Sequence, residues 1–414
     1  MHKKLLPAYL LVLVNILGFS LMLPVLPFIV EDYGAPKYVY GFLLSSYSLF
    51  QFLAAPYLGK LSDSKGRKPV LLISQAGTLM CWFVFVFAYF MPEISIFGFA
   101  LPLYIIALAR VVDGITGGNN SVTQAYVADI TSREEKSYVF GYIGGIVGLG
   151  LIIGPGVGGF LSSGSIGYLG TVLCALVISL VTLISIYVGL DESLPEEKRS
   201  KFEKQPISQS FRLLYRIKKL DPPPIIRKIF AVRGCFTVTM ATYISTIALF
   251  MIDVFQFDER ELGFFMLFVG FFVSFNQVVL SKKFISWFGE YRTMRIGLFL
   301  CTVGLICITL TQNIWLYIPL YYILNLGISL CIPTFNSILA QTSRPQQVGE
   351  VMGISESIIS LSNAFIPIIA TMVYTWIGSQ IYWYTAILPL IGLWISKGEA
   401  MTITDVPEGV LEEK

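Results

Sequence analysis

An arginine and an aspartate, Arg110 and Asp113, stand three residues apart inside a long apolar stretch of the sequence. Because residues three apart lie on one face of a helix, the guanidinium and the carboxylate can meet there. Each charge costs about 2.5–3.5 kcal/mol at the centre of a hydrocarbon layer, so the two must pair or face a watery cavity. Two interpretations stay open. Asp113 either binds and releases a proton beside the fixed cation Arg110, or forms a permanent structural ion pair with it.

Proton transfer inside the apolar stretches falls to carboxylates, because the single histidine of the chain is His2, at its start. Two acids besides Asp113 are candidates: Asp253 and Glu356, each toward the end of an apolar stretch. For both, a plain surface or helix-end charge is an equal alternative. We therefore expect Asp113, next to Arg110, to be the main proton-coupling residue.

The elements that must hold these charges are long apolar helices. Of the 414 residues, 55% are hydrophobic and only 13% are charged, against roughly 25% charged in soluble domains. A helix needs about 20 apolar residues to cross about 30 Å of hydrocarbon. Twelve spans are predicted, at residues 5–30, 38–58, 70–91, 98–127, 138–162, 166–190, 229–252, 262–284, 293–311, 314–340, 350–374 and 378–396. Only Gln312 and Asn313 separate 293–311 from 314–340, so a merged pair, giving eleven spans, is the alternative.

The basic residues give the chain an orientation. Nearly all of the 29 Lys and Arg residues lie at the chain ends, in the long middle loop or in every second short loop. Lys37 and Arg260 lie in the opposite loops, and Arg110 is inside a span. Since cytoplasmic loops are enriched in basic residues, we expect both termini and the middle loop in the cytoplasm. This topology accounts for the net charge of +3, so we expect no nucleic-acid partner.

One long polar segment, residues 191–227, divides the chain into residues 1–190 and 228–414, with six spans each. Its section 210–220 is either an amphipathic helix on the membrane surface or a solvated linker. A glycine precedes a proline by 14 residues in both the fifth and the eleventh span. Such repeats favour an all-α membrane protein of two pseudo-symmetric six-helix bundles around a central path.

The loop after the second span combines glycines with opposite charges, at Gly59, Asp63, Gly66 and Arg67. The glycines permit close approach and a tight turn, and the two charges can pair at a helix junction. Asp129, at the end of the fourth span, is a natural further partner for Arg67. The loop is predicted to latch one state of a moving bundle. A loop that is merely basic would not need two glycines with an aspartate between them.

The fifth span carries a pattern of small residues and one proline: Gly150, Gly154, Pro155, Gly158 and Gly159. Small residues four apart flatten one face of a helix, so that another backbone can pack against it closely. A proline removes one backbone hydrogen bond and bends the helix. The pattern therefore predicts a bent, flat helix at an interface that moves.

These motifs carry a family resemblance. The loop from Gly59 to Lys68 resembles the signature G-x-L-x-D-x-x-G-R-K of the major facilitator superfamily, and the segment after Arg110 resembles its fourth-helix motif R-x-x-x-G. The fifth span matches G-x-x-x-G-P-x-x-G-G, which marks the proton-coupled antiporters of that superfamily. From about residue 10 to 395 the chain is similar to the twelve-helix drug:H+ antiporters, and within them to the tetracycline exporters. Where those exporters carry an aspartate in the first span, this chain has Asn15, which argues against tetracycline itself as the substrate.

The resemblance implies a multi-pass transporter of a bacterial inner membrane. It would export a small amphipathic or hydrophobic compound in exchange for protons, by alternating access. The resemblance also implies the pairing of Arg67 with Asp129. We expect a monomer whose partners are the small-molecule substrate, protons and the lipid bilayer, with no cofactor.

The substrate is expected near the bilayer midplane between the two halves. Residues that could line its cavity are the polar and aromatic side chains within the spans, although about half of such polar residues serve helix packing instead. The candidates are Asn15, Phe19, Asn120, Gln124, Tyr243, Gln277, Asn325 and Asn336.

Two other functions compete with export. A proton-coupled symporter or a uniporter for a small metabolite would use the same fold, but the glycine–proline pattern of the fifth span argues against it. A membrane enzyme or receptor would need a metal cluster, a nucleophile–base pair or a phosphate-binding loop, and the sequence shows none of these. We therefore expect neither enzymatic activity nor a metal site.

Overall fold

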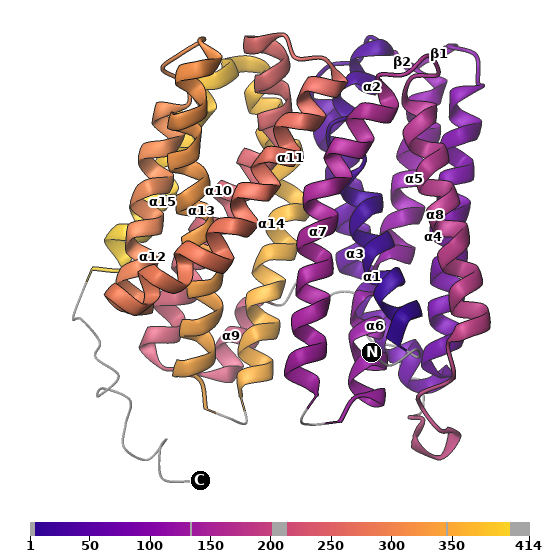
Figure 1. Cartoon of the computed structure of the whole chain (residues 1–414), viewed down its shortest axis with the longest axis horizontal. Helices are drawn as coiled ribbons and strands as arrows, with labels where there is room; N and C mark the ends of the chain where they lie inside the picture. The colour runs from indigo at the N-terminus through magenta and orange to yellow at the C-terminus, as the bar shows by residue number, and fades with distance from the viewer. Residues whose placement is uncertain (1–4, 133–134, 201–212, 345–346, 398–414) are drawn as a thin grey trace. The chain divides into compact units, whose positions relative to one another are not determined.

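The computed structural model describes residues 5–132, 135–200, 213–344 and 347–397, and these are almost entirely helical (Figure 1). The helices are α1 (Leu6–Ser20), α2 (Leu26–Asp32), α3 (Tyr38–Lys65), α4 (Arg67–Tyr89), α5 (Leu101–Gly117), α6 (Asn120–Ile130), α7 (Lys136–Ser162), α8 (Tyr168–Gly189), α9 (Leu213–Leu220), α10 (Pro224–Phe255), α11 (Glu259–Phe275), α12 (Ser281–Cys307), α13 (Ile314–Thr342), α14 (Val348–Ile377) and α15 (Ile381–Ile395). Two short strands, β1 (Ser95–Ile96) and β2 (Phe99–Ala100), pair antiparallel before α5. A π-helical turn, Asn276–Leu280, joins α11 to α12.

The described helices can account for the predicted crossings. Eight helical stretches are long and apolar enough to span a membrane. Two of them, 259–307 with 49 residues and 348–395 with 48, are more than twice as long as one crossing requires. Each contains a glycine with positive φ, Gly289 at 74° and Gly378 at 56°, where the chain can turn back. Together with α3 and the first predicted span, which consists of α1 and α2, these stretches are consistent with twelve crossings.

The spans predicted at 293–311 and 314–340 are separate helices. α12 ends at Cys307, and α13 begins at Ile314. The side chain of Asn313 accepts a hydrogen bond from Trp315 N at 2.9 Å, which satisfies one of the backbone donors left open at the start of a helix. The merged helix that the eleven-span alternative requires is therefore not present, and the separate helices are consistent with twelve spans.

Two spans that the sequence predicts as continuous are divided. The first, 5–30, consists of α1 and α2 with turns at residues 21–25, where Pro24 removes a backbone donor. The fourth, 98–127, is interrupted at residues 118–119 between α5 and α6. Hydropathy does not detect these breaks because an average over a whole span is dominated by its apolar majority, although Asn119 and Asn120 stand at the second break. Discontinuous helices are typical of the binding sites of transporters, where they expose backbone polar groups.

The middle segment is partly helical. α9 covers residues 213–220 of the section predicted as an amphipathic helix or a linker, and residues 210–212 lie outside the described residues. Its contact with a membrane surface stays a prediction, as does the division of the chain into two bundles around residues 191–227.

By its internal packing the chain separates into two compact units. The first contains residues 1–210 with 245–271 and 364–376, and the second contains 211–244, 272–363 and 377–414. Within the first unit, α4 packs against α5 and α8, which Figure 1 shows as neighbouring ribbons, and α3 packs against α5. Within the second unit, α12 packs against α13 and α15.

Glycines make α7 flat where it meets α1. A methyl group added at Gly154 would overlap Ser20 Oγ, and one at Gly158 would overlap the carbonyl oxygen of Leu21. Gly150 contributes to the same contact, because its carbonyl oxygen accepts a hydrogen bond from Ser20 Oγ at 3.0 Å. The predicted close backbone approach is confirmed on this face.

A second flat face of α7 meets α11. A methyl group at Gly159 would lie 2.8 Å from Gly263 Cα, and one at Gly263 would lie 2.7 Å from the carbonyl oxygen of Pro155. The two backbones are therefore in contact, since no side chain stands between them. The fifth-span motif thus serves two packing contacts, one with α1 and one with α11.

We expect Gly158→Ala to lower the thermal stability of the purified protein. The new methyl group has to displace the backbone at Leu21, and such overpacking costs about 1–3 kcal/mol. Gly145→Ala is the matched control on the same helix, because a methyl group there meets nothing within 4 Å and gains helix propensity. Melting curves in detergent check this. Equal melting temperatures for the two variants would contradict the close approach.

Candidate functional site

Arg110 and Asp113 meet on α5, one turn apart, as the sequence predicts. Arg110 has no exposed surface, and Asp113 is 4% exposed. Arg110 Nη1 donates a hydrogen bond to Asp113 Oδ2 at 3.3 Å. The Cζ atom of Arg110 also lies 4.5 Å from the centroid of the Tyr47 ring, so a cation–π interaction adds to the ion pair. Both charges are therefore buried and share one small environment.

The ion pair occupies only part of the hydrogen-bonding capacity of Arg110. Among the described residues, its Nε and Nη2 atoms are buried and have no acceptor. The hydroxyl of Tyr40 is likewise buried without a partner there. Paired arginine and carboxylate groups usually form shorter bonds of about 2.7–2.9 Å, often two in parallel. A single long hydrogen bond therefore joins Arg110 to Asp113, and two donor nitrogens of Arg110 have no acceptor among the described residues.

Tyr47, on α3, is fixed beside the ion pair by its neighbours. Gln51 Nε2 donates to Tyr47 OH at 3.0 Å and to the carbonyl oxygen of Gly117 at 3.1 Å. A methyl group at Gly114 would lie 2.5 Å from the Tyr47 carbonyl oxygen, so α3 and α5 touch through their backbones. Phe19, a predicted lining residue on α1, stacks on the Tyr47 ring with centroids 5.8 Å apart. Phe19 therefore helps to position the ring that lies against the guanidinium.

Asn15 reaches the break in the fourth span. Its Nδ2 donates to Asn119 Oδ1 at 2.6 Å and to Asn120 Oδ1 at 3.1 Å. Asn119 is fully buried, and its own Nδ2 has no partner among the described residues. This residue was not predicted, although the glycines directly before it mark a weak point of the helix. A neutral amide at position 15 thus joins α1 to the start of α6.

Arg67 connects α3, α4 and α6. Its Nη1 donates to Asp63 Oδ1 at 2.5 Å, and its Nε donates to Asp129 Oδ2 at 3.1 Å, so the predicted pairing is confirmed. Glu192, which was not predicted, accepts from the backbone N of Arg67 at 2.8 Å. Gly66 has a φ of 100°, and a methyl group there would lie 2.9 Å from Glu192 Cδ. The turn therefore requires glycine, whereas the latching role of this junction stays a prediction.

Gly59 differs from the expectation. α3 continues to Lys65, so Gly59 lies within a helix and not in a loop. A methyl group there would meet only Ser121 Oγ, at the ordinary distance of 3.7 Å. The predicted close approach at Gly59 is therefore wrong, because the helix extends past the apolar part of the second span.

Asp253 and Glu356 have more solvent around them than Asp113. Asp253, near the end of α10, forms an ion pair with Lys37, and its side chain is 32% exposed. It also accepts a hydrogen bond from Tyr374 OH at 2.9 Å. Glu356 is an exposed residue of α14. These surroundings suit surface charges, and a part of either acid in proton coupling stays a prediction.

A second buried cation, Arg233, lies on α10 in the second unit and is 5% exposed. Its Nη1 donates to Oδ1 of Asn336, a predicted lining residue, at 3.0 Å, and its Cζ lies 5.4 Å from the centroid of the Phe335 ring. Its Nε has no acceptor among the described residues. The carboxylate of Glu356 is close enough for its charge to attract the guanidinium of Arg233. Arg233 lies within the predicted span 229–252, which corresponds to α10, but its burial and its partners were not predicted.

The other lining candidates of the second unit take part in polar pairs. Asn325 accepts from Asn276 Nδ2 at 3.2 Å, and the hydroxyls of Tyr243 and Tyr321 form a hydrogen bond. Asn276 is fully buried, whereas the predicted Gln277 beside it is partly exposed. The π-helical turn that begins at Asn276 directs this residue inward. Substrate contact by any of these side chains stays a prediction.

Two lining candidates of the first unit are exposed. Asn120 and Gln124 lie four residues apart on α6, so both belong to one face of that helix. Within the described ranges, no group of three or more His, Cys, Asp or Glu side chains is placed to hold a metal ion.

Comparison with known proteins identifies relatives over nearly the whole chain. A model of the Major Facilitator Superfamily matches residues 8–367 and, in a second match, 283–404. The class H tetracycline resistance protein of Pasteurella multocida is 24% identical over 392 residues, which are 92% of this chain and 91% of that protein. Multidrug resistance protein 1 of Bacillus subtilis is 24% identical over 381 residues, 91% of each chain. Among solved structures, a human organic anion transporter has the same fold, with a TM-score of 0.71 at 23% identity over 95% of this chain and 99% of that one.

We expect Asp113→Asn to destabilise the protein at mildly alkaline pH. The substitution leaves the Arg110 guanidinium buried without a counter-charge, which typically costs about 3–5 kcal/mol. Adding Arg110→Gln should recover part of that loss, because no buried charge then remains. Asp253→Asn is the control, since an exposed ion pair contributes at most about 1 kcal/mol. Thermal melting of the four proteins checks this, and an Asp113→Asn variant as stable as the wild type would contradict it.

Proposed function

Because the chain belongs to the Major Facilitator Superfamily, we propose that it exports a small amphipathic or hydrophobic compound in exchange for protons. Membership in this superfamily identifies the chain as a transporter, and export is the narrower proposal. Export is supported by relatives named as tetracycline and multidrug resistance proteins. It is supported further by the glycine–proline pattern of α7, which resembles that of the proton-coupled antiporters.

The Arg110–Asp113 pair is the observation that supports proton coupling. A permanent structural ion pair would be expected to satisfy its buried donors, since each unsatisfied donor costs about 1–3 kcal/mol. Here one bond of 3.3 Å joins the two side chains, and two guanidinium nitrogens have no acceptor among the described residues. Such a pair exchanges partners more readily than a bidentate one. The geometry therefore favours a titrating carboxylate over a purely structural one.

In the proposed cycle, the protonation state of Asp113 controls the binding of the substrate. In the outward-facing state Asp113 takes up a proton, its bond to Arg110 loosens, and the substrate leaves. In the inward-facing state Asp113 releases the proton to the cytoplasm, the ion pair forms again, and the site can accept new substrate. Proton and substrate compete because each is bound better by one protonation state of Asp113.

The surroundings of the pair indicate the class of substrate. The ring of Tyr47 lies against the guanidinium, Phe19 stacks on that ring, and Asn15 of the first span is neutral. Flat apolar surfaces with few charges suit amphipathic or hydrophobic molecules, which they hold without strict geometry. The amide at position 15 argues against tetracycline itself, because the exporters it resembles carry an aspartate there.

We also propose a location and an orientation for the protein. The distribution of Lys and Arg supports both termini and residues 191–227 on the cytoplasmic side of a bacterial inner membrane. The transport unit is proposed to be the monomer, since each superfamily chain contains both halves of its fold.

Transport in liposomes tests the proposal. Candidate compounds come from a drug-sensitivity panel on an efflux-deficient host that expresses the chain. With the purified protein and a pH-sensitive dye inside the vesicles, a gradient of the compound should drive proton movement in the opposite direction. We expect Asp113→Asn to reduce this coupled proton flux at least about tenfold, because amides do not titrate. The same measurement on Asp253→Asn decides whether this second candidate acid takes part.

Two outcomes would contradict the proposal. Unchanged coupled flux in Asp113→Asn would remove the proposed role of this carboxylate. Movement of compound and protons in the same direction would indicate a symporter, which is the alternative function in this fold.

A further inference from the structure

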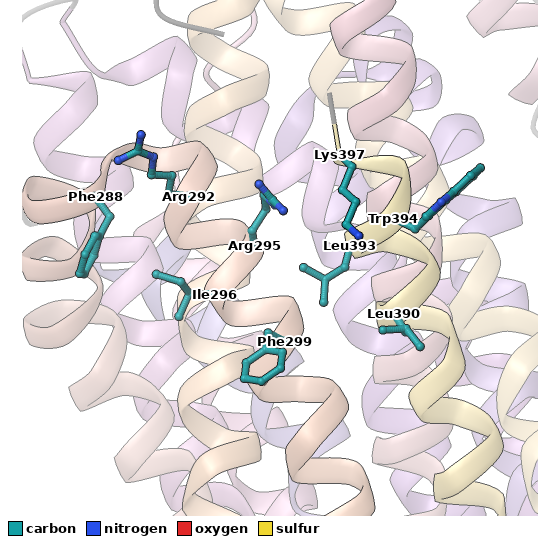
Figure 2. A pocket seen from close by; sticks show the side chains of 9 residues that line it. All are labelled: Phe288, Arg292, Arg295, Ile296, Phe299, Leu390, Leu393, Trp394 and Lys397. Atoms are coloured by element: carbon teal, nitrogen blue, oxygen red, sulfur yellow. The ribbon is translucent and has the colours of Figure 1, made fainter. Parts of the chain in front are cut away.

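A pocket outside the transport site opens between α12 and α15 in the second unit. Its volume is about 680 Å³. Three cations line it: Arg292 and Arg295 from α12, and Lys397 directly after α15. Figure 2 shows the side chains of Arg295 and Lys397 reaching into the gap from the two helices. None of the lining residues is acidic.

The charge of this pocket is not neutralised by the protein that the structure describes. No ion pair among the described residues involves any of the three cations. Arg295 Nε is buried and has no acceptor there. The neighbouring acid on α12, Glu290, is engaged elsewhere, because it accepts hydrogen bonds from Gln341 at 2.9 Å and Ser337 at 3.4 Å on α13. The pocket therefore has a net positive charge and a spare donor.

Apart from Phe288, which lines the charged end, the lining changes from charged to apolar in the same direction along both helices. On α12, Arg292, Arg295 and Phe299 follow one face over about 10 Å of helix. On α15, Lys397 is followed inward by Trp394 and then by a leucine, as Figure 2 shows. Phe299 is 55% exposed and Trp394 is 71% exposed, so both present large apolar surfaces outside the protein core.

This order matches a phospholipid, which has a charged headgroup above apolar chains. Tryptophan at such a boundary is typical of the membrane interface. The walls are also held together, because Tyr291 OH of α12 donates to the carbonyl oxygen of Ser396 at 2.7 Å. The cations lie on the side of the membrane that the basic residues assign to the cytoplasm.

We propose that the pocket binds an anionic phospholipid of the cytoplasmic leaflet. The headgroup phosphate lies between Arg295 and Lys397, with Arg292 adding its charge from the preceding turn of α12, and the acyl chains follow Phe299 and Trp394. Basic pockets between helices on the cytoplasmic side attract anionic headgroups, and each nearby cation adds to the attraction. The proposal depends on membrane insertion and not on proton coupling or on the exported compound.

Quenching of Trp394 by brominated lipid tests this site. The protein is placed in phosphatidylcholine nanodiscs with increasing brominated phosphatidylglycerol, and the signal of Trp394 is obtained by subtracting the Trp394→Phe variant. We expect selective quenching by the brominated anionic lipid. The double variant Arg292→Gln, Arg295→Gln should need about tenfold more of that lipid for the same quenching. Lys282→Gln with Lys283→Gln is the matched control, since it removes two cations of the same helix outside the pocket and should behave as wild type.

Several results would overturn the proposal. Equal quenching by brominated phosphatidylcholine would show contact with bulk lipid and no headgroup selectivity. Equal weakening by the control variant would show a general surface charge effect. Displacement of the quenching by millimolar inorganic phosphate would assign the pocket to a small free anion. Selective quenching that appears only after Glu399→Gln and Asp405→Asn would assign it to the acidic end of the chain itself. Melting curves of each variant verify that it is folded.

Discussion

A guanidinium group with no exposed surface sets the main constraint on this helical bundle. Arg110 cannot lose its charge, so the protein around it has to supply what water would have supplied. It does so with the carboxylate of Asp113 and the face of Tyr47, and with glycines that let α3 and α5 approach until that ring lies against the charge. The solvation is incomplete, because two nitrogens of the guanidinium have no acceptor among the described residues. The proposed response of the site to a proton depends on this incompleteness.

The helices around the site combine rigidity with points of weakness. The first and fourth spans are both divided, and Asn15 of α1 reaches the break in the fourth span. α7 offers two glycine faces, one to α1 and one to α11, at which the neighbouring helix packs closely. Arg67 ties three helix ends at one junction. All of these contacts lie within the first compact unit.

Local sequence was sufficient where a property depends on neighbouring residues. Hydropathy predicted the spans, and the spacing of Gly154 and Gly158 predicted the flat face of α7. Features that depend on tertiary contacts were not predictable. The burial of Arg233 depends on its contacts with Asn336 and Phe335 of α13. Asn276 is buried at the start of a π-helical turn, and Glu192 meets α4 only through folding of the chain. The helix breaks at residues 21–25 and 118–119 were not predicted either, because each involves only a few residues and barely changes the mean hydropathy of its span.

The protonation of Asp113 is the quantity that decides between an exchangeable and a permanent ion pair. Infrared difference spectra between acid and alkaline pH, recorded in lipid for the wild type and for Asp113→Asn, isolate the signal of this carboxyl group. If proton coupling runs through Asp113, the wild type gains a protonated-carboxyl band on acidification that the variant lacks. Identical difference spectra for the two proteins over the whole pH range would contradict that role.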